Sequence, residues 1–331
     1  MSDTAAVSGA TGFIGSAVVR ELLAGGRKVR ALVEPGADPK NLDGLDVERV
    51  TVDVCDLTAM TRALEGCDAF YHLAAIYKIW LPDPDPIYRV NIEGTMASLL
   101  AADRAGVKRI VYTSSIAAVG TREDGEPSDE TVAFNLYDIA NDYILTKHLS
   151  ERVAMRFAES GMPIVIVNPA FPFGERDTAP TPTGTIVLSV LRHEVPAIGP
   201  GGFCAVDVKD VAKAHVAAET RGRVGERYIL GNHNVTFEQF IGLVSEIAGL
   251  EPPKMRVPAS VGRAMAQGFE FWAKHVTHGP PRITVKGIEY MQQRLFFDCR
   301  KAHEELGMPT TPLHDSVERS VRFFRESGMA P

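Results

Sequence analysis

The amino-acid sequence predicts an α/β protein, built as a doubly wound parallel sheet (Rossmann-like) followed by a smaller, mostly helical C-terminal lobe. Three observations lead to this fold class. Short β-branched runs alternate with amphipathic stretches in the first two-thirds of the chain, and a glycine-rich turn follows the first run. After Pro169, prolines and glycines become frequent and interrupt the regular pattern. Strands separated by helix-length segments imply right-handed crossovers and a sheet covered on both faces.

Six apolar runs are expected to form the main sheet, which makes two mononucleotide-binding halves. They are residues 5–8, 29–33, 50–52, 69–73, 110–113 and 164–167. Closely spaced prolines and glycines after residue 169 predict loops over a site. Further along we expect a strand end and helix at 206–220, a strand at 227–230 and a helix at 236–248 capped by Thr236. Two units follow: residues 1–168, with returns at about 203–230, and residues 169–331.

The bulk composition excludes several classes of protein. With 331 residues and 45% hydrophobic content the chain can bury a large core, and its net charge of -7 offers no basic field for nucleic acid. The four cysteines stand far apart, which favours reduced thiols in a cytoplasmic protein and leads us to expect no metal site. No signal-peptide pattern opens the chain, and no run approaches the roughly 20 apolar residues of a membrane span.

The glycine-rich turn lies between the first predicted strand and the first predicted helix. It reads Gly9-Ala10-Thr11-Gly12-Phe13-Ile14-Gly15. The first glycine permits a tight turn, the second lets a pyrophosphate approach the backbone, and the third lets the helix pack on the strand. The first unit is therefore expected to bind NAD(P), and the second to bind the substrate.

Acidic residues follow the next two strands. Glu34 comes 19 residues after Gly15, where a carboxylate would bind the adenosine ribose and repel a 2′-phosphate, which favours NAD over NADP. The alternative that Glu34 is simply a solvated carboxylate at the end of a strand stays open, because Arg30 and Lys40 could still bind a phosphate. At the predicted end of the third strand, Asp53 and the backbone of Val54 could meet the adenine, or Asp53 could simply form a turn.

A phenol and an ammonium group lie one helical turn apart at Tyr143 and Lys147. A nearby cation favours the phenolate and would bring the pKa of Tyr143 toward the range of proton exchange with an alcohol or a carbonyl. Thr113-Ser114-Ser115 closes the fifth strand at the edge where such sheets bind ligands. Together with the glycine-rich turn, these residues predict an oxidoreductase, whereas a non-catalytic dinucleotide sensor would be expected to lack the Tyr/Lys pair.

At these residues the chain resembles the extended short-chain dehydrogenase/reductase superfamily over essentially its whole length. Ser8 to Gly15 matches the family's glycine motif, with Ser in place of a leading Thr, and Asn91-Ile-Glu-Gly94-Thr95 resembles its Asn-x-x-Gly-Thr helix. The resemblance implies that Ser115, Tyr143 and Lys147 are the catalytic trio. It further implies cofactor contacts from Leu73, Ala74, Ala75, Thr113, Tyr143, Lys147, Pro169 and Ala170.

Within that superfamily the chain is most similar to the hopanoid-associated sugar epimerase group, which resembles dihydroflavonol 4-reductases and 3β-hydroxysteroid dehydrogenases. The segments that carry this similarity are residues 75–84, 180–184 and 295–298. Many nucleotide-sugar members have an Arg just before the Asp-Val segment, where this chain has Phe203, and an apolar ring cannot clamp a diphosphate. A nucleotide-sugar epimerase or dehydratase is therefore the alternative, and an apolar ring substrate of steroid, triterpenoid or flavonoid type is preferred.

The expected substrate pocket is aromatic, although each ring alone could equally serve the core. Its members are Tyr77, Trp80, Phe171, Phe173 and Phe203, with Phe134 nearby. Residues 259–276 are more apolar than a surface helix needs, which indicates packing within the lobe or, as the alternative, contact with a membrane or a lipidic substrate. The resemblance makes a homodimer through two helices a common arrangement, which no pattern in this chain requires.

Overall fold

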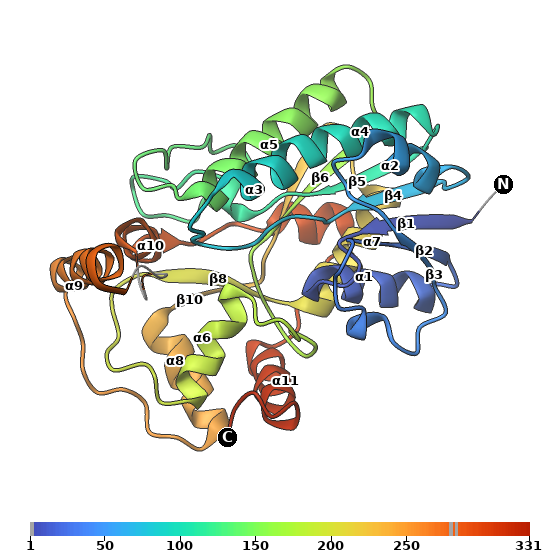
Figure 1. Cartoon of the computed structure of the whole chain (residues 1–331). Coiled ribbons are helices and arrows are strands. Elements are labelled where there is room, and N and C mark those ends of the chain that lie inside the picture. Colours follow the sequence, from blue (N-terminus) through green and yellow to red (C-terminus); the bar gives the residue numbers. More distant parts are fainter. Residues whose placement is uncertain (1–2, 278–280, 282–283) are drawn as a thin grey trace.

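The main sheet has seven strands and is parallel throughout (Figure 1). The computed structural model describes residues 3–277, 281 and 284–331. The strand order is β3-β2-β1-β4-β5-β6-β9, so the winding reverses between β1 and β4. The strands are β1 (Thr4–Ser8), β2 (Lys28–Val33), β3 (Glu48–Thr51), β4 (Ala69–His72), β5 (Arg109–Thr113), β6 (Ile164–Pro169) and β9 (Arg227–Leu230). The predicted fold class is confirmed, and the strand expected at 227–230 joins this sheet as its seventh member.

Helices cover both faces of the sheet, because alternate residues of each strand point to opposite sides. In β1, Ala5 and Val7 belong to one apolar core, whereas Ala6 belongs to the other. The first core lies under α1 (Phe13–Ala24) and α7 (Val208–Arg221), and the second under α2 (Leu57–Leu64), α4 (Gly94–Arg104) and α5 (Asp142–Glu159). Short helical segments complete this part: η1 (Lys40–Leu42), α3 (Asp85–Tyr88), η2 (Arg89–Glu93) and η3 (Ile116–Ala118).

The C-terminal lobe contains a second, smaller sheet that the sequence did not predict. Its strands are β7 (Phe171–Phe173), β8 (Gly202–Asp207), β10 (His233–Thr236) and β11 (Arg294–Leu295). β8 is the strand with which each of the other three pairs. Its helical segments are α6 (Pro182–Leu191), α8 (Phe237–Ala248), α9 (Ala259–Trp272), η4 (Ala273–Thr277), α10 (Val285–Met291), η5 (Ala302–Leu306) and α11 (Leu313–Glu326). Two of these strands, β7 and β11, have only three and two residues, which is too few for an alternating pattern to be recognised in a sequence.

The proline-rich stretch after residue 169 is more regular than predicted. Pro182 occupies the first turn of α6, where its missing N–H has no helical partner to lose, and the Thr181 hydroxyl accepts the Gly184 N–H at 3.1 Å. The prediction of loops throughout this stretch is therefore wrong for 171–173 and 182–191. The capping of α8 by Thr236 is confirmed, with Gln239 completing a reciprocal capping box.

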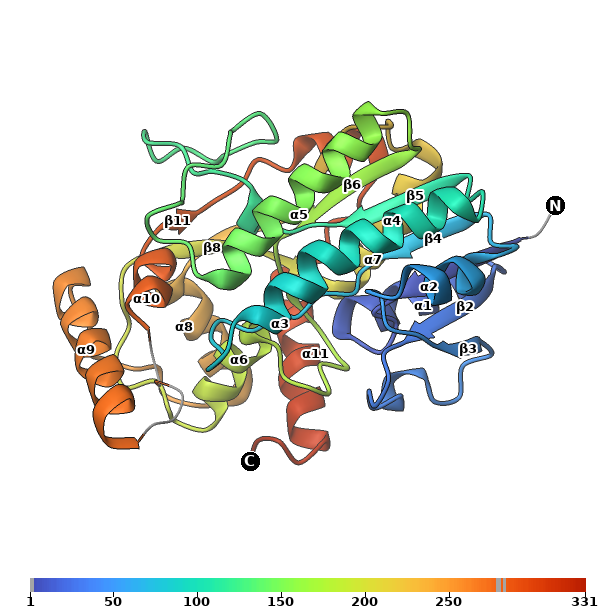
Figure 2. The same cartoon turned by 45° about the horizontal axis from the view of Figure 1, so that its top comes forward.

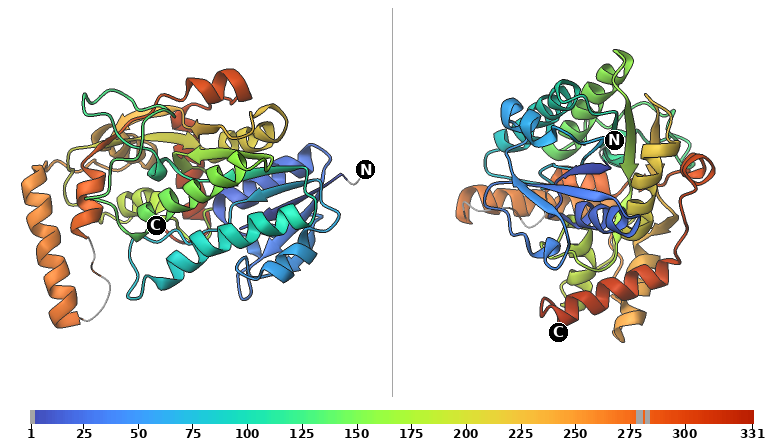
Figure 3. Two further views of the ribbon diagram at one scale, coloured as in Figure 1. Left: turned by 90° about the horizontal axis from the view of Figure 1, so that it is seen from above. Right: turned by 90° about the vertical axis from the view of Figure 1, so that its right-hand side faces the viewer.

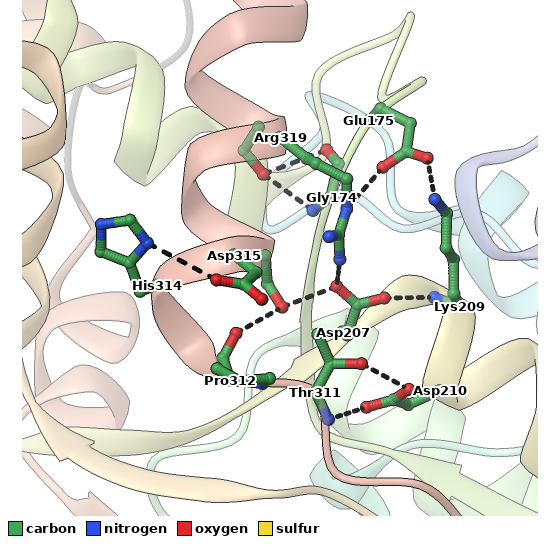
Figure 4. A network of polar contacts seen from close by, with 12 residues as sticks. Gly174, Glu175, Asp207, Lys209, Asp210, Thr311, Pro312, His314, Asp315 and Arg319 are labelled. Carbon is green, nitrogen blue, oxygen red and sulfur yellow. Dashed lines mark hydrogen bonds and ion pairs between the residues drawn. The ribbon is translucent and has the colours of Figure 1, made fainter.

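A buried carboxylate joins the C-terminal helix to the second sheet (Figure 4). The side chain of Asp207 accepts hydrogen bonds from the Ser316 hydroxyl at 2.6 Å and the Lys209 N–H at 2.8 Å, and it pairs with Arg319 of α11. Arg319 also pairs with Glu175 at 3.0 Å. This network joins β8, α7 and α11. It therefore holds the C-terminal helix against the segment by which the chain passes from the second sheet back to the main sheet.

A neighbouring carboxylate secures the segment that leads into α11. Asp210 accepts the Thr311 N–H at 2.7 Å, the Thr311 hydroxyl at 2.8 Å and the Asn232 amide at 2.9 Å. Burial raises the pKa of Asp210, and the two bonds from Thr311 act against that shift.

Across the part of the chain that the structure describes, no helix combines the length and the apolar content needed to cross a bilayer.

Replacing Asp207 by Asn is expected to lower the free energy of unfolding by about 3 kcal/mol, because it leaves a largely buried guanidinium with less compensating charge. Urea denaturation measures this loss. The matched control is Asp124→Asn, whose partner Arg122 is exposed and whose solvent-screened ion pair should contribute little to stability. Equal losses in the two variants would contradict the role given to Asp207.

Candidate active site

The glycine-rich turn is packed so closely that side chains would not fit. Gly9 has φ +66°, and a Cβ there would lie 2.8 Å from the Ala74 nitrogen. A Cβ on Gly15 would lie 2.0 Å from the Gly9 carbonyl oxygen, which also accepts the Gly12 N–H at 3.0 Å. Gly12 is the N-cap of α1 and has no side chain to satisfy the first N–H groups of the helix. A bare cradle at a helix N-terminus fits the pyrophosphate of a dinucleotide.

A buried hydroxyl and imidazole hold the two central strands together beside this turn. Ser8 Oγ is 2.9 Å from His72 Nδ1 and accepts the N–H groups of Leu73 at 3.2 Å and Ala74 at 3.3 Å. His72 Nε2 lies 3.3 Å from the hydroxyl of Thr95. Burial, with a smaller effect of Lys147, lowers the pKa of His72 to about 3, so the ring stays neutral. Residues 73–75 are thereby held next to Gly9.

The acidic residues after β2 and β3 occupy different settings. Glu34 directly follows β2 and is exposed. Asp53 lies two residues beyond the end of β3, where it accepts the Cys55 N–H at 2.9 Å and pairs with Arg89 at 3.2 Å. The structure therefore corrects its placement at the strand end.

The two basic residues left open as phosphate ligands also differ. Arg30 pairs with Glu48 at 2.8 Å and donates to the Ala63 carbonyl at 2.9 Å. Because these contacts already occupy the guanidinium of Arg30, it is not free to bind a cofactor phosphate. Lys40 is exposed at the start of η1.

Lys147 connects α5 to the end of β5. Its ammonium is buried and donates to the Thr113 carbonyl at 2.8 Å. Burial lowers the pKa of Lys147 to about 8, and the carboxylate of Glu151 acts in the opposite direction. The lysine is thus fixed at the carboxyl edge of the sheet.

The phenol of Tyr143 lies one turn before Lys147, at the start of α5. Burial raises its pKa well above the ordinary value, Tyr77 adds to the shift, and a hydrogen bond with Ser115 opposes it. The expectation that Lys147 lowers the pKa of Tyr143 is therefore wrong for the protein as described, because burial dominates and the ammonium bonds to a backbone carbonyl. At neutral pH Tyr143 is a protonated phenol.

Ser115 follows β5 and is positioned from two sides. Its hydroxyl accepts the Ala117 N–H at 3.1 Å, and its carbonyl accepts the Asn168 amide at 2.9 Å. Asn168 also donates to Glu151 at 2.5 Å, and Glu151 pairs with Arg227 at 2.8 Å.

Sequence reasoning missed Glu151. This buried carboxylate on α5 links Asn168 to Arg227, and so supports Ser115 through the Asn168 amide. Its spacing of four residues from Lys147, on the same face of the helix, was the available signal.

Asn91 connects the loop after β4 to α5. Its Oδ1 accepts the Ile76 N–H at 2.7 Å, and its amide donates to the Thr146 hydroxyl at 3.0 Å. Asn91 lies in the π-helical segment η2, and its side chain is buried. The same contact positions Tyr77, whose ring centroid is 4.5 Å from that of Tyr143.

The aromatic residues predicted for the substrate pocket separate into two groups. Tyr77 lies at the mouth of the site, with its hydroxyl 3.4 Å from that of Thr183, and Trp80 is half-buried three residues on. Phe173 and Phe203 are 1% and 0% exposed. These two pack in tilted and edge-to-face contacts in a cluster with Phe171, Phe237 and Phe240. Packing of β7 and β8 against α8 accounts for Phe173 and Phe203, which corrects their assignment to the pocket. Phe171 is 9% exposed and belongs to the same cluster, with its ring centroid 4.7 Å from that of Phe203.

Phe134 belongs to a different hollow. Its ring stacks on His148 with centroids 4.2 Å apart, and both line a cavity of about 490 Å³ together with Glu130, Arg152 and Arg227. His148 and Arg152 lie on a different face of α5 from the one that carries Tyr143 and Lys147.

Pro169 ends β6, and Ala170 donates its N–H to the Leu230 carbonyl at 2.9 Å. Thr113 is paired in register with Val167. The ends of β5 and β6 therefore bring Ser115, Pro169 and Ala170 to one edge of the sheet.

Comparisons with known proteins agree with this geometry. Residues 5–231 match the model of the NAD dependent epimerase/dehydratase family. The chain is 36% identical over 336 residues to a Synechocystis sp. protein that carries the name of a dihydroflavonol 4-reductase, covering 99% of this chain and 96% of that one. It is 33% identical over 327 residues to sterol demethylase protein B of Methylococcus capsulatus, covering 98% and 99%. The crystal structure of gox2253 has a TM-score of 0.89 at 38% identity, covering 99% and 100%.

Stability is expected to fall as the pH is lowered from 7 to 5. Burial lowers the pKa of His72 to about 3 and that of His215 to about 4, whereas both take up protons near pH 6.5 when unfolded. The unfolded state then binds more protons, which removes about 2 kcal/mol per histidine by pH 5. Thermal unfolding at the two pH values measures it. His215→Asn should reduce the loss of stability between pH 7 and pH 5, whereas His314→Asn, at an exposed site, should not. Identical losses in the two variants would show that the buried histidine does not cause the effect.

Proposed function

This chain belongs to the NAD dependent epimerase/dehydratase family, within the extended short-chain dehydrogenase/reductase superfamily, and from that membership we propose that it interconverts a secondary alcohol and a ketone on an apolar ring substrate. The family resemblance of the sequence is confirmed, and NAD is the cofactor of this enzyme family. One observation carries the proposal: Ser115, Tyr143 and Lys147 meet at the carboxyl end of β5, beside the sheet edge that begins at the glycine-rich turn.

The proton chemistry follows from the states of these groups. NAD, when bound, would supply or accept the hydride. The protonated phenol of Tyr143 donates its proton to the carbonyl oxygen of the substrate, and the hydroxyl of Ser115 holds that oxygen. Lys147, with a pKa of about 8, is mainly charged at neutral pH and stabilises the phenolate that remains. A phenol that holds its proton suits the reduction direction.

The cofactor would be held along the carboxyl edge of β1, β2 and β4. The turn from Gly9 to Gly15 would take the pyrophosphate, and Glu34 the adenosine ribose. Asp53 and Val54 would lie toward the adenine. The nicotinamide side would be lined by residues 73–75, Thr113, Pro169 and Ala170.

The substrate assignment rests on what surrounds Tyr143. Its ring lies against Tyr77, and both Tyr143 and Tyr290 pack on the cluster that contains Ala117 and Ile144. Flat apolar surfaces of this kind suit a fused-ring alcohol or ketone. The names of the two relatives, a dihydroflavonol reductase and a sterol demethylase protein, point to ring substrates of the same character.

The second candidate is a nucleotide-sugar epimerase or dehydratase, which the family description favours. Against it stands Phe203, which is buried where many such enzymes present an Arg to the diphosphate. A non-catalytic dinucleotide sensor is the third candidate, and the retained Tyr143 and Lys147 disfavour it. We also place the enzyme in the cytoplasm without a nucleic-acid partner, on the evidence of its four unpaired cysteines and its acidic charge.

Replacing Tyr143 by Phe is expected to lower kcat about 10² to 10⁴-fold, because the proton donor is lost while the ring remains. The assay follows NADH oxidation with a panel of oxosteroids, flavanonols and UDP-sugars. NADH binding, followed by fluorescence, should be largely retained, because the glycine-rich turn expected to take the pyrophosphate is unaltered. Tyr137→Phe at an exposed site should keep full activity. Undiminished turnover by the Tyr143 variant would remove the proposed mechanism, and turnover of UDP-sugars alone would establish the second candidate.

NADH is expected to bind at least about tenfold more tightly than NADPH, because a carboxylate at Glu34 would repel the 2′-phosphate. Glu34→Arg should reverse or abolish that preference in a fluorescence titration of both cofactors. Glu21→Arg, at a half-buried position of α1, serves as the charge-matched control and should change neither affinity. Tighter binding of NADPH to the unaltered protein would show that Glu34 does not select the cofactor.

A further inference from the structure

We propose that α9 and its flanking residues form a peripheral docking surface for an anionic lipid bilayer. The central observation is a row of apolar side chains that faces solvent. Val261, Met265, Trp272 and Val276, which we call the α9 stripe, are 44%, 45%, 57% and 51% exposed. Phe271 lies beside the stripe and is 64% exposed.

The concentration of exposed apolar groups here is unusual for the molecule. Twelve large apolar side chains are exposed among the described residues, and six of them, including Met255, fall between residues 255 and 276. Contiguous exposed apolar surface of this kind marks an interaction site in soluble proteins, whereas single exposed side chains need no explanation.

The stripe follows the helical repeat, so one face of α9 carries it. Residues 261, 265, 272 and 276 are separated by four, seven and four positions, which places them on a single side of the helix. The opposite side makes the contacts with the lobe. Glu270 accepts the Val285 N–H at 2.8 Å, Gln292 donates to the Ala259 carbonyl at 3.0 Å, and Arg263 pairs with Glu289 at 3.2 Å.

The position of α9 leaves this face accessible. In Figures 2 and 3, α9 (orange) stands at the periphery of the molecule, at the end opposite β1 to β3. Neither its length nor its composition allows it to span a bilayer. An amphipathic helix of this kind lies in the interface with its apolar face among the lipid head groups and upper acyl chains.

The charge of the segment identifies the lipid. Residues 251–289 contain six Lys and Arg against three acidic residues, Glu251, Glu270 and Glu289, so the segment is net positive in a chain whose net charge is -7. Among the described side chains, Lys254 is 85% exposed and Arg263 59% exposed, and each forms an ion pair at the surface, with Glu251 and Glu289 respectively. Basic residues beside an apolar face attract anionic head groups. A second copy of the chain is a poorer occupant, since two-fold pairing of this face would bring the same positive charges together.

The same element reaches the candidate active site, and this step rests on the proposed function. α9 packs on α10, whose Tyr290 acts on the pKa of Tyr143. Ile79, 43% exposed, lies against α10, where its Cγ2 is 3.9 Å from a Cβ placed on Gly287. A bilayer held by α9 would therefore lie close to the mouth of the site, where an apolar ring substrate dissolved in lipid could enter.

Sedimentation of the full-length protein with vesicles tests the docking surface. Binding is expected with vesicles of phosphatidylcholine and phosphatidylglycerol at low salt, with weaker binding at high salt and little with phosphatidylcholine alone. The double variant Phe271→Ser, Trp272→Ser should lower the partition coefficient at least about tenfold. The matched control, Met96→Ser with Val224→Ser, removes exposed apolar groups on other elements and should bind as the unaltered protein does.

Three results would overturn the docking surface. They are no binding to anionic vesicles, equal binding to phosphatidylcholine alone, and a change from dimer to monomer in the Phe271/Trp272 variant, by sedimentation velocity, with vesicle binding unaffected. Unchanged melting temperature and NADH affinity in both double variants establish that they fold. The Tyr143→Phe variant should bind vesicles normally, so failure of the proposed reaction and failure of the docking surface give different results.

Discussion

The hydrogen bond from the buried ammonium of Lys147 to the Thr113 carbonyl is the contact on which the candidate active site depends. It fixes α5 against the carboxyl end of β5, so that Tyr143 on the helix and Ser115 after the strand share one location. A buried ammonium is costly unless it is compensated, and Glu151, one turn further along α5, supplies the opposing charge. Glu151 in turn engages Asn168 and Arg227, which belong to β6 and β9. Support for the candidate catalytic groups therefore extends across three adjacent strands, β5, β6 and β9.

On the other side of the sheet's switch point, the constraint is steric rather than electrostatic. Gly9 and Gly15 lie too close to neighbouring backbone to carry side chains, and the Ser8 and His72 pair holds β1 against the loop after β4. The helix N-terminus is left open to a ligand by the absence of a capping side chain at Gly12. The glycine-rich turn and the candidate proton-transfer groups lie along one edge because both follow the carboxyl ends of one parallel sheet.

The lobe is held by a separate set of contacts. Asp207 and Asp210 gather β8, α7 and the beginning of α11 around buried carboxylates, and the aromatic cluster around Phe203 fills the space between β8 and α8. α9 takes no part in this core: only Ala266 among the residues of α9 is fully buried. A helix that adds so little to the interior while exposing Trp272 and Phe271 is suited to contact another surface.

The sequence by itself determined the doubly wound sheet, the glycine-rich turn and the order of Ser115, Tyr143 and Lys147, because local periodicity and the spacing of a few residues specify them. The small strands β7 and β11, of three and two residues, are too short to leave such a pattern. Only the tertiary structure decided that Phe203 is core, that Glu151 supports the site and that burial keeps the proton on Tyr143. Each of these depends on which residues from distant segments surround a side chain, and burial and pairing of that kind have no local signature.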